Sequence, residues 1–120
     1  MNTKKSNWTS DEFLAYILLY SANADYVFDQ KEKNLILNKV DTNSYKKVSK
    51  ELAYDNDYQS LQKILLYTEN HKYDNNKINL LLHEIELLFM CDGKYDILEK
   101  NMMMNLTKLL KHQNKRNVLG

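Results

Sequence analysis

Apolar residues recur along this chain at spacings of three and four positions, which is the period of an amphipathic α-helix. The clearest stretch places six of them on one helical face: Ile78, Leu81, Leu82, Ile85, Leu88 and Phe89. No segment alternates apolar and polar residues over a useful length, and no Asn-Gly hairpin signal occurs, so we expect no β-sheet. The pattern predicts an all-α fold.

Cap residues and breaks in the pattern divide the chain into about six helices. We expect them at about 10–23, 30–40, 45–52, 58–68, 78–89 and 97–112. Thr9 and Glu12 have the spacing of a capping box before the first helix, and Trp8 is placed to pack on Phe13. The chain is therefore predicted to be a single-domain helical bundle over residues 9–112, with a flexible tail at 1–8 and a polar tail at 113–120.

A stretch of fourteen residues occurs twice. The segment from Asp25 to Asn38 recurs 67 positions later, from Asp92 to Asn105, and six positions are identical. Chance would supply about one identity, so we infer an internal duplication. The identical pairs are Asp25/Asp92, Asp29/Asp96, Glu32/Glu99, Lys33/Lys100, Asn34/Asn101 and Asn38/Asn105. Each copy predicts a helix, an acidic turn and a second helix, and two such hairpins suit a four-helix core.

The residues of the second turn explain its predicted shape. Gly93 follows a long apolar run, where a helix commonly ends in a residue at positive φ. Asp96 and Glu99 then have the spacing of a capping box, which begins the next helix. The first copy has Tyr26 in place of the glycine, so its turn must hold a non-glycine residue at positive φ or adopt another shape.

Acidic residues of the two turns are candidate metal ligands, because carboxylate and carbonyl oxygens suit hard cations. The loop is not an EF-hand, since apolar residues stand where that loop needs its bidentate glutamate. Two interpretations stay open: the carboxylates only cap helices, or they also hold a divalent cation such as Ca, Mg, Mn or Zn. No organic cofactor is indicated. The six candidates are Asp92, Asp96 and Glu99, and in the first copy Asp25, Asp29 and Glu32.

Other residues offer weaker chemistry. His83 and Glu86 could bind zinc only with help from another helix, so a solvated helix face is the favoured interpretation. Cys91 aligns with Ala24 and is interpreted as a small apolar filler. No glycine-rich phosphate loop, nucleophile–base pair or Glu-x-x-His di-iron motif is present, so we expect no enzyme. The numerous tyrosines either cover the bundle or line a groove for a protein partner.

Composition narrows the function classes. The chain has 120 residues, of which 43% are hydrophobic, enough for one domain with its own core. A formal charge of +1 without an extended basic cluster argues against nucleic acid. Met1–Ser10 lacks the apolar segment of a signal peptide, and no apolar run reaches the roughly 20 residues of a membrane span. We expect a cytoplasmic protein, with peripheral membrane association left open.

The acidic turns carry a resemblance to a known family. In the TerB-like family, a helix ends in Ala-Asp-Gly or a near variant, a glutamate opens the next helix, and this motif occurs twice. The present chain resembles that family. Here the matching residues are Ala24–Asp25 with Glu32, and Cys91–Gly93 with Glu99. The resemblance covers about residues 10–112 and implies an all-helical bundle with candidate metal-binding sites at its acidic turns. It also implies a bacterial, non-catalytic accessory module linked to tellurite resistance and stress.

Overall fold

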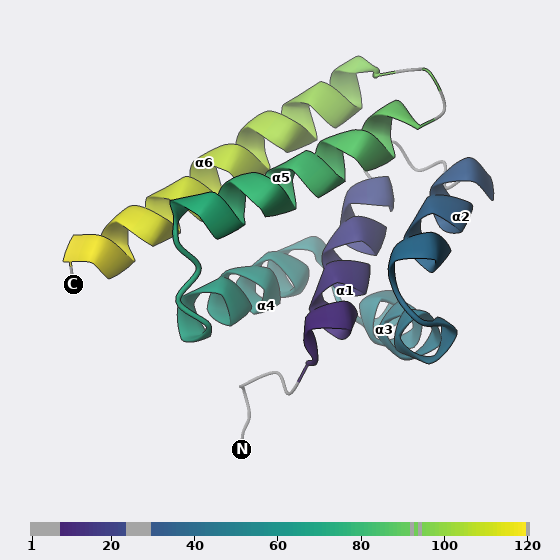
Figure 1. Ribbon diagram of the computed structural model, residues 1–120, viewed down its shortest axis with the longest axis horizontal. Helices are drawn as coiled ribbons and strands as arrows, with labels where there is room; N and C mark the ends of the chain where they lie inside the picture. Colours follow the sequence, from purple (N-terminus) through teal and green to yellow (C-terminus); the bar gives the residue numbers. More distant parts are fainter. Residues whose placement is uncertain (1–7, 24–29, 92, 94, 120) are drawn as a thin grey trace.

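The computed structural model describes residues 8–23, 30–91, 93 and 95–119, the last seven of these as backbone only. All regular structure in these residues is helical, which confirms the all-α prediction (Figure 1). The described residues form a bundle of 40 × 29 × 24 Å. Its helices are α1 (Ser10–Ala22), α2 (Gln30–Lys39), α3 (Thr42–Tyr54), α4 (Asp57–Asn70), α5 (Asn75–Met90) and α6 (Ile97–Leu119).

The first helix, α1, forms the centre of the bundle. It packs against α2, α3, α4 and α5, most extensively against α3 (Figure 1). All of its residues from Glu12 to Ala22 are buried except the half-buried Leu14. A helix that is apolar on most of its circumference needs partners on all sides, and α1 has them.

Side chains at the start of α1 fix the beginning of this helix. Thr9 Oγ1 accepts a hydrogen bond from the Glu12 amide at 3.1 Å, and Glu12 Oε1 accepts one from the Thr9 amide at 3.0 Å. This reciprocal pair confirms the predicted capping box. The Trp8 ring lies 6.0 Å from Phe13, and its Nε1 donates to Glu51 Oε1 of α3 at 2.9 Å. Trp8 therefore closes the end of the core.

The second hairpin, α5 and α6, lies along one side of the bundle as two long antiparallel helices (Figure 1). The apolar stripe of the last helix predicts core positions at Met102, Met103, Leu106, Leu109 and Leu110. Leu106 and Leu110 of α6 are buried as this stripe predicts, whereas Leu109 is 37% exposed. It continues to Leu119, seven residues beyond its expected end at 112. Residues 113–119 contain neither glycine nor proline, so nothing in their sequence stops the helix.

The duplication is visible in the helix boundaries. The second helix of the hairpin begins at Gln30 in the first copy and at Ile97 in the second, and these residues are 67 positions apart, as are the two copies. Gly93 has a φ of 82°, which confirms the predicted left-handed residue after α5. The prediction for Tyr26 lies outside the described residues.

Candidate functional site

The acidic turn of the second copy begins α6 with the predicted cap. Asp96 Oδ1 accepts from the Glu99 amide at 2.9 Å, and Glu99 Oε1 accepts from the Asp96 amide at 3.2 Å. One oxygen of each carboxylate is therefore engaged by the backbone at the start of the helix. Glu99 is only 3% exposed, so its side chain is packed into the bundle.

The first copy repeats part of this arrangement. Glu32, the counterpart of Glu99, is also 3% exposed and lies in the first turn of α2. The other candidates Asp25, Asp29 and Asp92 lie outside the described residues. Among the residues that are described, no three carboxylate, imidazole or thiol groups come close enough to hold a metal ion. Cation binding at the turns stays a prediction.

The weaker candidates from the sequence are not brought together. His83 is exposed on α5, and Glu86 is half-buried one turn further along. Cys91 follows the last residue of α5 and is half-buried, so it is less enclosed than the apolar filler we expected. The three consecutive methionines align with Leu35–Leu37 of the first copy, which predicts a core role for two of them. Met102 and Met103 pack against the core and Met104 is exposed, in agreement with that prediction.

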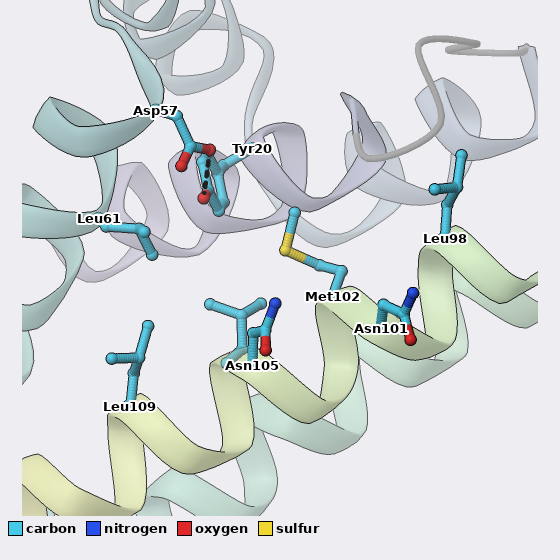
Figure 2. A pocket seen from close by; sticks show the side chains of 9 residues that line it. Tyr20, Asp57, Leu61, Leu98, Asn101, Met102, Asn105 and Leu109 are labelled. Atoms are coloured by element: carbon cyan, nitrogen blue, oxygen red, sulfur yellow. Dashed lines mark hydrogen bonds between the residues drawn. The ribbon is translucent and has the colours of Figure 1, made fainter.

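A groove between α4 and α6 is the feature that the sequence did not predict. Figure 2 shows Leu61 of α4 and Leu109 of α6 pointing toward each other across it. A second hollow adjoins the first at shared residues and extends it to the junction of α3 and α4. We call the two together the α4–α6 groove. The first hollow is lined by Tyr20, Asp57, Leu61, Leu98, Asn101, Met102, Asn105, Leu106 and Leu109.

The wall that α6 contributes to this groove follows helical spacing. Leu98, Met102, Asn105 and Leu109 are separated by four, three and four residues, so they share one face of the helix. We expected Met102 and Leu109 in the core because they continue the apolar stripe. The amides of Asn101 and Asn105 within that stripe are the signal that part of this face is solvated.

Asp57 lies in the groove where the two hollows meet. The Tyr20 hydroxyl donates a hydrogen bond to Asp57 Oδ1 at 2.7 Å (Figure 2). Burial raises the pKa of Tyr20 well above its ordinary value, and the bond to the Asp57 carboxylate raises it further. The hydroxyl therefore stays protonated at neutral pH and orients the carboxylate of Asp57.

A second carboxylate, Asp55, has its charge compensated. The Tyr16 hydroxyl donates to Asp55 Oδ2 at 2.6 Å, and Lys63 Nζ donates to the same oxygen at 2.8 Å and to Glu51 Oε2 at 2.8 Å. Burial lowers the pKa of Lys63, but the bonds to Asp55 and Glu51 outweigh it, so the pKa is raised. These groups connect α1, α3 and α4 and serve the fold.

Another hollow lies between α1 and α5 and mixes charges of both signs. Its lining includes Asp11, Lys77 and Glu84, together with the apolar Leu80 and Leu14. Because acidic and basic groups alternate there, it selects no single partner chemistry. The α4–α6 groove is the more distinctive site.

The fold is an all-α helical bundle with an open groove between α4 and α6. The chain finds no match among family models, curated proteins or solved structures. Function must therefore be argued from the residues themselves. Of the helices that the structure describes, none has the length and apolar character needed to cross a membrane.

Proposed function

We propose that this chain is a non-catalytic binding module that engages another protein in the α4–α6 groove. The observation that carries the proposal is the apolar lining left open between two helices, with Leu61 on one side and Leu98 and Leu109 on the other. Leu98 and Leu109 are among the exposed large apolar residues of the chain. Open apolar grooves bordered by polar groups are typical of interaction sites.

The polar groups of the groove support binding rather than catalysis. Tyr20 holds its proton because its pKa is raised, so its hydroxyl is a poor nucleophile and a poor acid at neutral pH. Asn101 and Asn105 have amide side chains, which donate and accept hydrogen bonds but do not exchange protons with a substrate. Such groups fix the orientation of a bound chain.

Site-specific photo-crosslinking in the native cell tests this function. A photoreactive phenylalanine derivative replaces Leu109, which is 37% exposed in the groove, or Leu87, which is 39% exposed on α5 and outside the groove lining. We expect one defined protein adduct at position 109 that is absent at position 87. The same adducts at both positions, or none at either, would contradict the proposal.

We further propose divalent-cation binding at the acidic turns as a second candidate function. Its support is that Glu32 and Glu99 occupy equivalent repeat positions and are both buried at the start of a helix. A carboxylate fixed in this way loses little freedom when it becomes a ligand. The TerB-like resemblance supports the same idea and extends it to tellurite and stress resistance.

Calorimetric unfolding tests the second candidate. The chelated protein is heated with and without millimolar calcium, magnesium, manganese or zinc. A cation that binds only the folded state at a hundredfold excess over its Kd adds about 2.7 kcal/mol of stability. We expect one cation to raise the midpoint and Asp92→Asn to abolish the rise. An unchanged midpoint with all four cations would leave the turns as helix caps.

A further inference from the structure

We infer that the partner segment bound in the α4–α6 groove is a basic amphipathic helix, whose lysine or arginine pairs with Asp57. This inference rests on the binding function proposed above and adds the chemistry of the occupant. Three observations carry it: the charge of the groove, the exposed tyrosines that flank its acidic segment in sequence, and the spacing of its apolar wall.

The charge of the groove has one sign. In the part of the chain that the structure describes, the lining of its two hollows includes Asp55 and Asp57 and contains no lysine, arginine or histidine. The charge of Asp55 is compensated by Lys63. Among the described residues, Asp57 accepts a hydrogen bond from the neutral hydroxyl of Tyr20 and takes part in no ion pair. An exposed carboxylate beside an apolar groove favours a cation on the partner.

Two exposed tyrosines beside the acidic segment 55–57 in the sequence favour the same partner. Tyr54 and Tyr58 flank the acidic segment 55–57 in sequence and are 89% and 70% exposed. An aromatic face attracts the ammonium of lysine and, more often, the guanidinium of arginine. Carboxylate and aromatic groups thus lie in one short segment where a basic side chain would enter.

The apolar wall fits a helix. From Leu98 to Leu109 the wall spans twelve residues of α6, whose eleven steps of 1.5 Å make roughly 16 Å, or about three helical turns. A partner helix with apolar residues at spacings of three and four would set them against this stripe. The amides of Asn101 and Asn105 lie along the same wall and can bond to polar side chains on its flank.

Selection from a displayed peptide library tests the inference. The library consists of helical peptides of about 14 residues with apolar residues fixed on one stripe and all other positions random. We expect peptides selected against the full chain to carry lysine or arginine on one flank. Their Kd is then measured by fluorescence anisotropy on the chain and its variants.

Two matched pairs of variants locate the contact. Asp57→Asn keeps an acceptor for Tyr20 but removes the charge, and should weaken binding about threefold. Its control, Glu69→Gln, removes an exposed charge from the same helix outside the groove lining and should leave the Kd unchanged. Asn105→Lys should weaken binding about tenfold through like-charge repulsion. Its control is Asn38→Lys, at the exposed equivalent position in the repeat.

The outcomes separate this inference from the proposed function. Selected peptides that depend on position 105 but carry no basic bias would overturn the basic partner and leave the binding groove standing. The absence of any groove-dependent peptide, together with no adduct at position 109, would overturn both. Self-association of the chain that Asn105→Lys abolishes would assign the groove to a second copy and also overturn the inference.

Discussion

The two copies of the repeated hairpin share a sequence pattern but have different surroundings. Phe13 of α1 and Leu80 of α5 are 67 positions apart, like the repeat, and both are large and apolar. Phe13 is 1% exposed, whereas Leu80 is 66% exposed. The same contrast holds one or two turns later, where Tyr20 is buried and its counterpart Leu87 is exposed. At these two pairs of equivalent positions, the first copy is thus buried and the second is exposed.

The difference comes from the helices between the two copies. Both α3 and α4 pack on α1, which covers the face that carries Phe13 and Tyr20. The helix α5 has α1, α2 and α6 as its main neighbours, so Leu80 and Leu87 face solvent. The duplication sets the local order of helix, turn and helix. The intervening chain determines which copy becomes the centre.

The largest effect that tests this comparison is the loss of a buried side chain. Phe13→Ala removes a ring that stacks on Tyr67 with centroids 4.1 Å apart, and should cost about 3–5 kcal/mol of unfolding free energy. The equivalent change in the second copy, Leu80→Ala, should cost less than about 0.5 kcal/mol. Urea denaturation measures both. Equal losses would show that α5 is covered as completely as α1.

The next effect is pH-dependent and involves buried groups of α1 and their neighbour Lys63 on α4. Tyr16 and Tyr20 have raised pKa values, mainly through burial, and the ion pairs of Lys63 raise its pKa. The folded state therefore holds all three protons more tightly than the unfolded chain, whose groups titrate near pH 10. Stability present below that pH is lost as the pH rises through 10 and above.

Single substitutions test which groups cause this loss of stability at alkaline pH. Tyr16→Phe removes one titrating group and its hydroxyl contacts to Asp55 and Ser60, so it should cost about 1–3 kcal/mol at pH 7 and reduce the dependence on pH above 10. Urea denaturation from pH 7 to 11 measures both effects. Tyr58→Phe, at an exposed position, serves as the control and should follow the wild type. An unchanged slope in Tyr16→Phe would contradict the assignment.

Local features of the fold were predictable because local chemistry determines them. The capping boxes at Thr9 and Asp96 depend on side chains three residues apart, and Gly93 ends α5 through its own backbone freedom. The helical period located all six helices. The extension of α6 to Leu119 was missed because polar composition was interpreted as a tail, although no helix-breaking residue occurs there.

The groove was not predictable because it depends on which helices meet. Leu109 continues the apolar stripe of α6, and sequence alone does not tell whether Leu61 of α4 covers it or faces it across a gap. The bond from Tyr20 to Asp57 joins residues 37 positions apart, which no local pattern indicates. The acidic turns were found from the repeat, but whether they bind a cation remains a prediction.

A smaller loss of stability is expected when the helix cap of either hairpin is removed. Asp96→Ala removes the acceptor for the Glu99 amide and should cost about 1 kcal/mol, with or without divalent ions. If the first turn forms the same cap, Asp29→Ala should cost a similar amount. Thermal unfolding in chelator and in each cation measures both. A cost that appears only when a cation is present would instead favour the metal site.

The smallest effect concerns an ion pair between the two copies. Lys39 Nζ of α2 lies 2.6 Å from Glu84 Oε1 of α5, and this oxygen is shielded from solvent. At the equivalent repeat positions stand Leu106 and Ile17, both buried and apolar. The ion pair thus occupies two positions at which the other copy of the repeat has buried apolar residues.

A double-mutant cycle shows whether the pair or its apolar equivalent is the better contact. Glu84→Leu together with Lys39→Met should change the unfolding free energy little or raise it, because an apolar pair avoids the cost of desolvating two charges. Lys39→Met alone should cost about 1 kcal/mol, since it leaves Glu84 Oε1 shielded without its counter-ion. The two changes should therefore be coupled by about 0.5–1 kcal/mol in urea denaturation at low salt. Additive losses would instead mean that α2 and α5 meet through other contacts, and that the two copies do not pack on each other at this position.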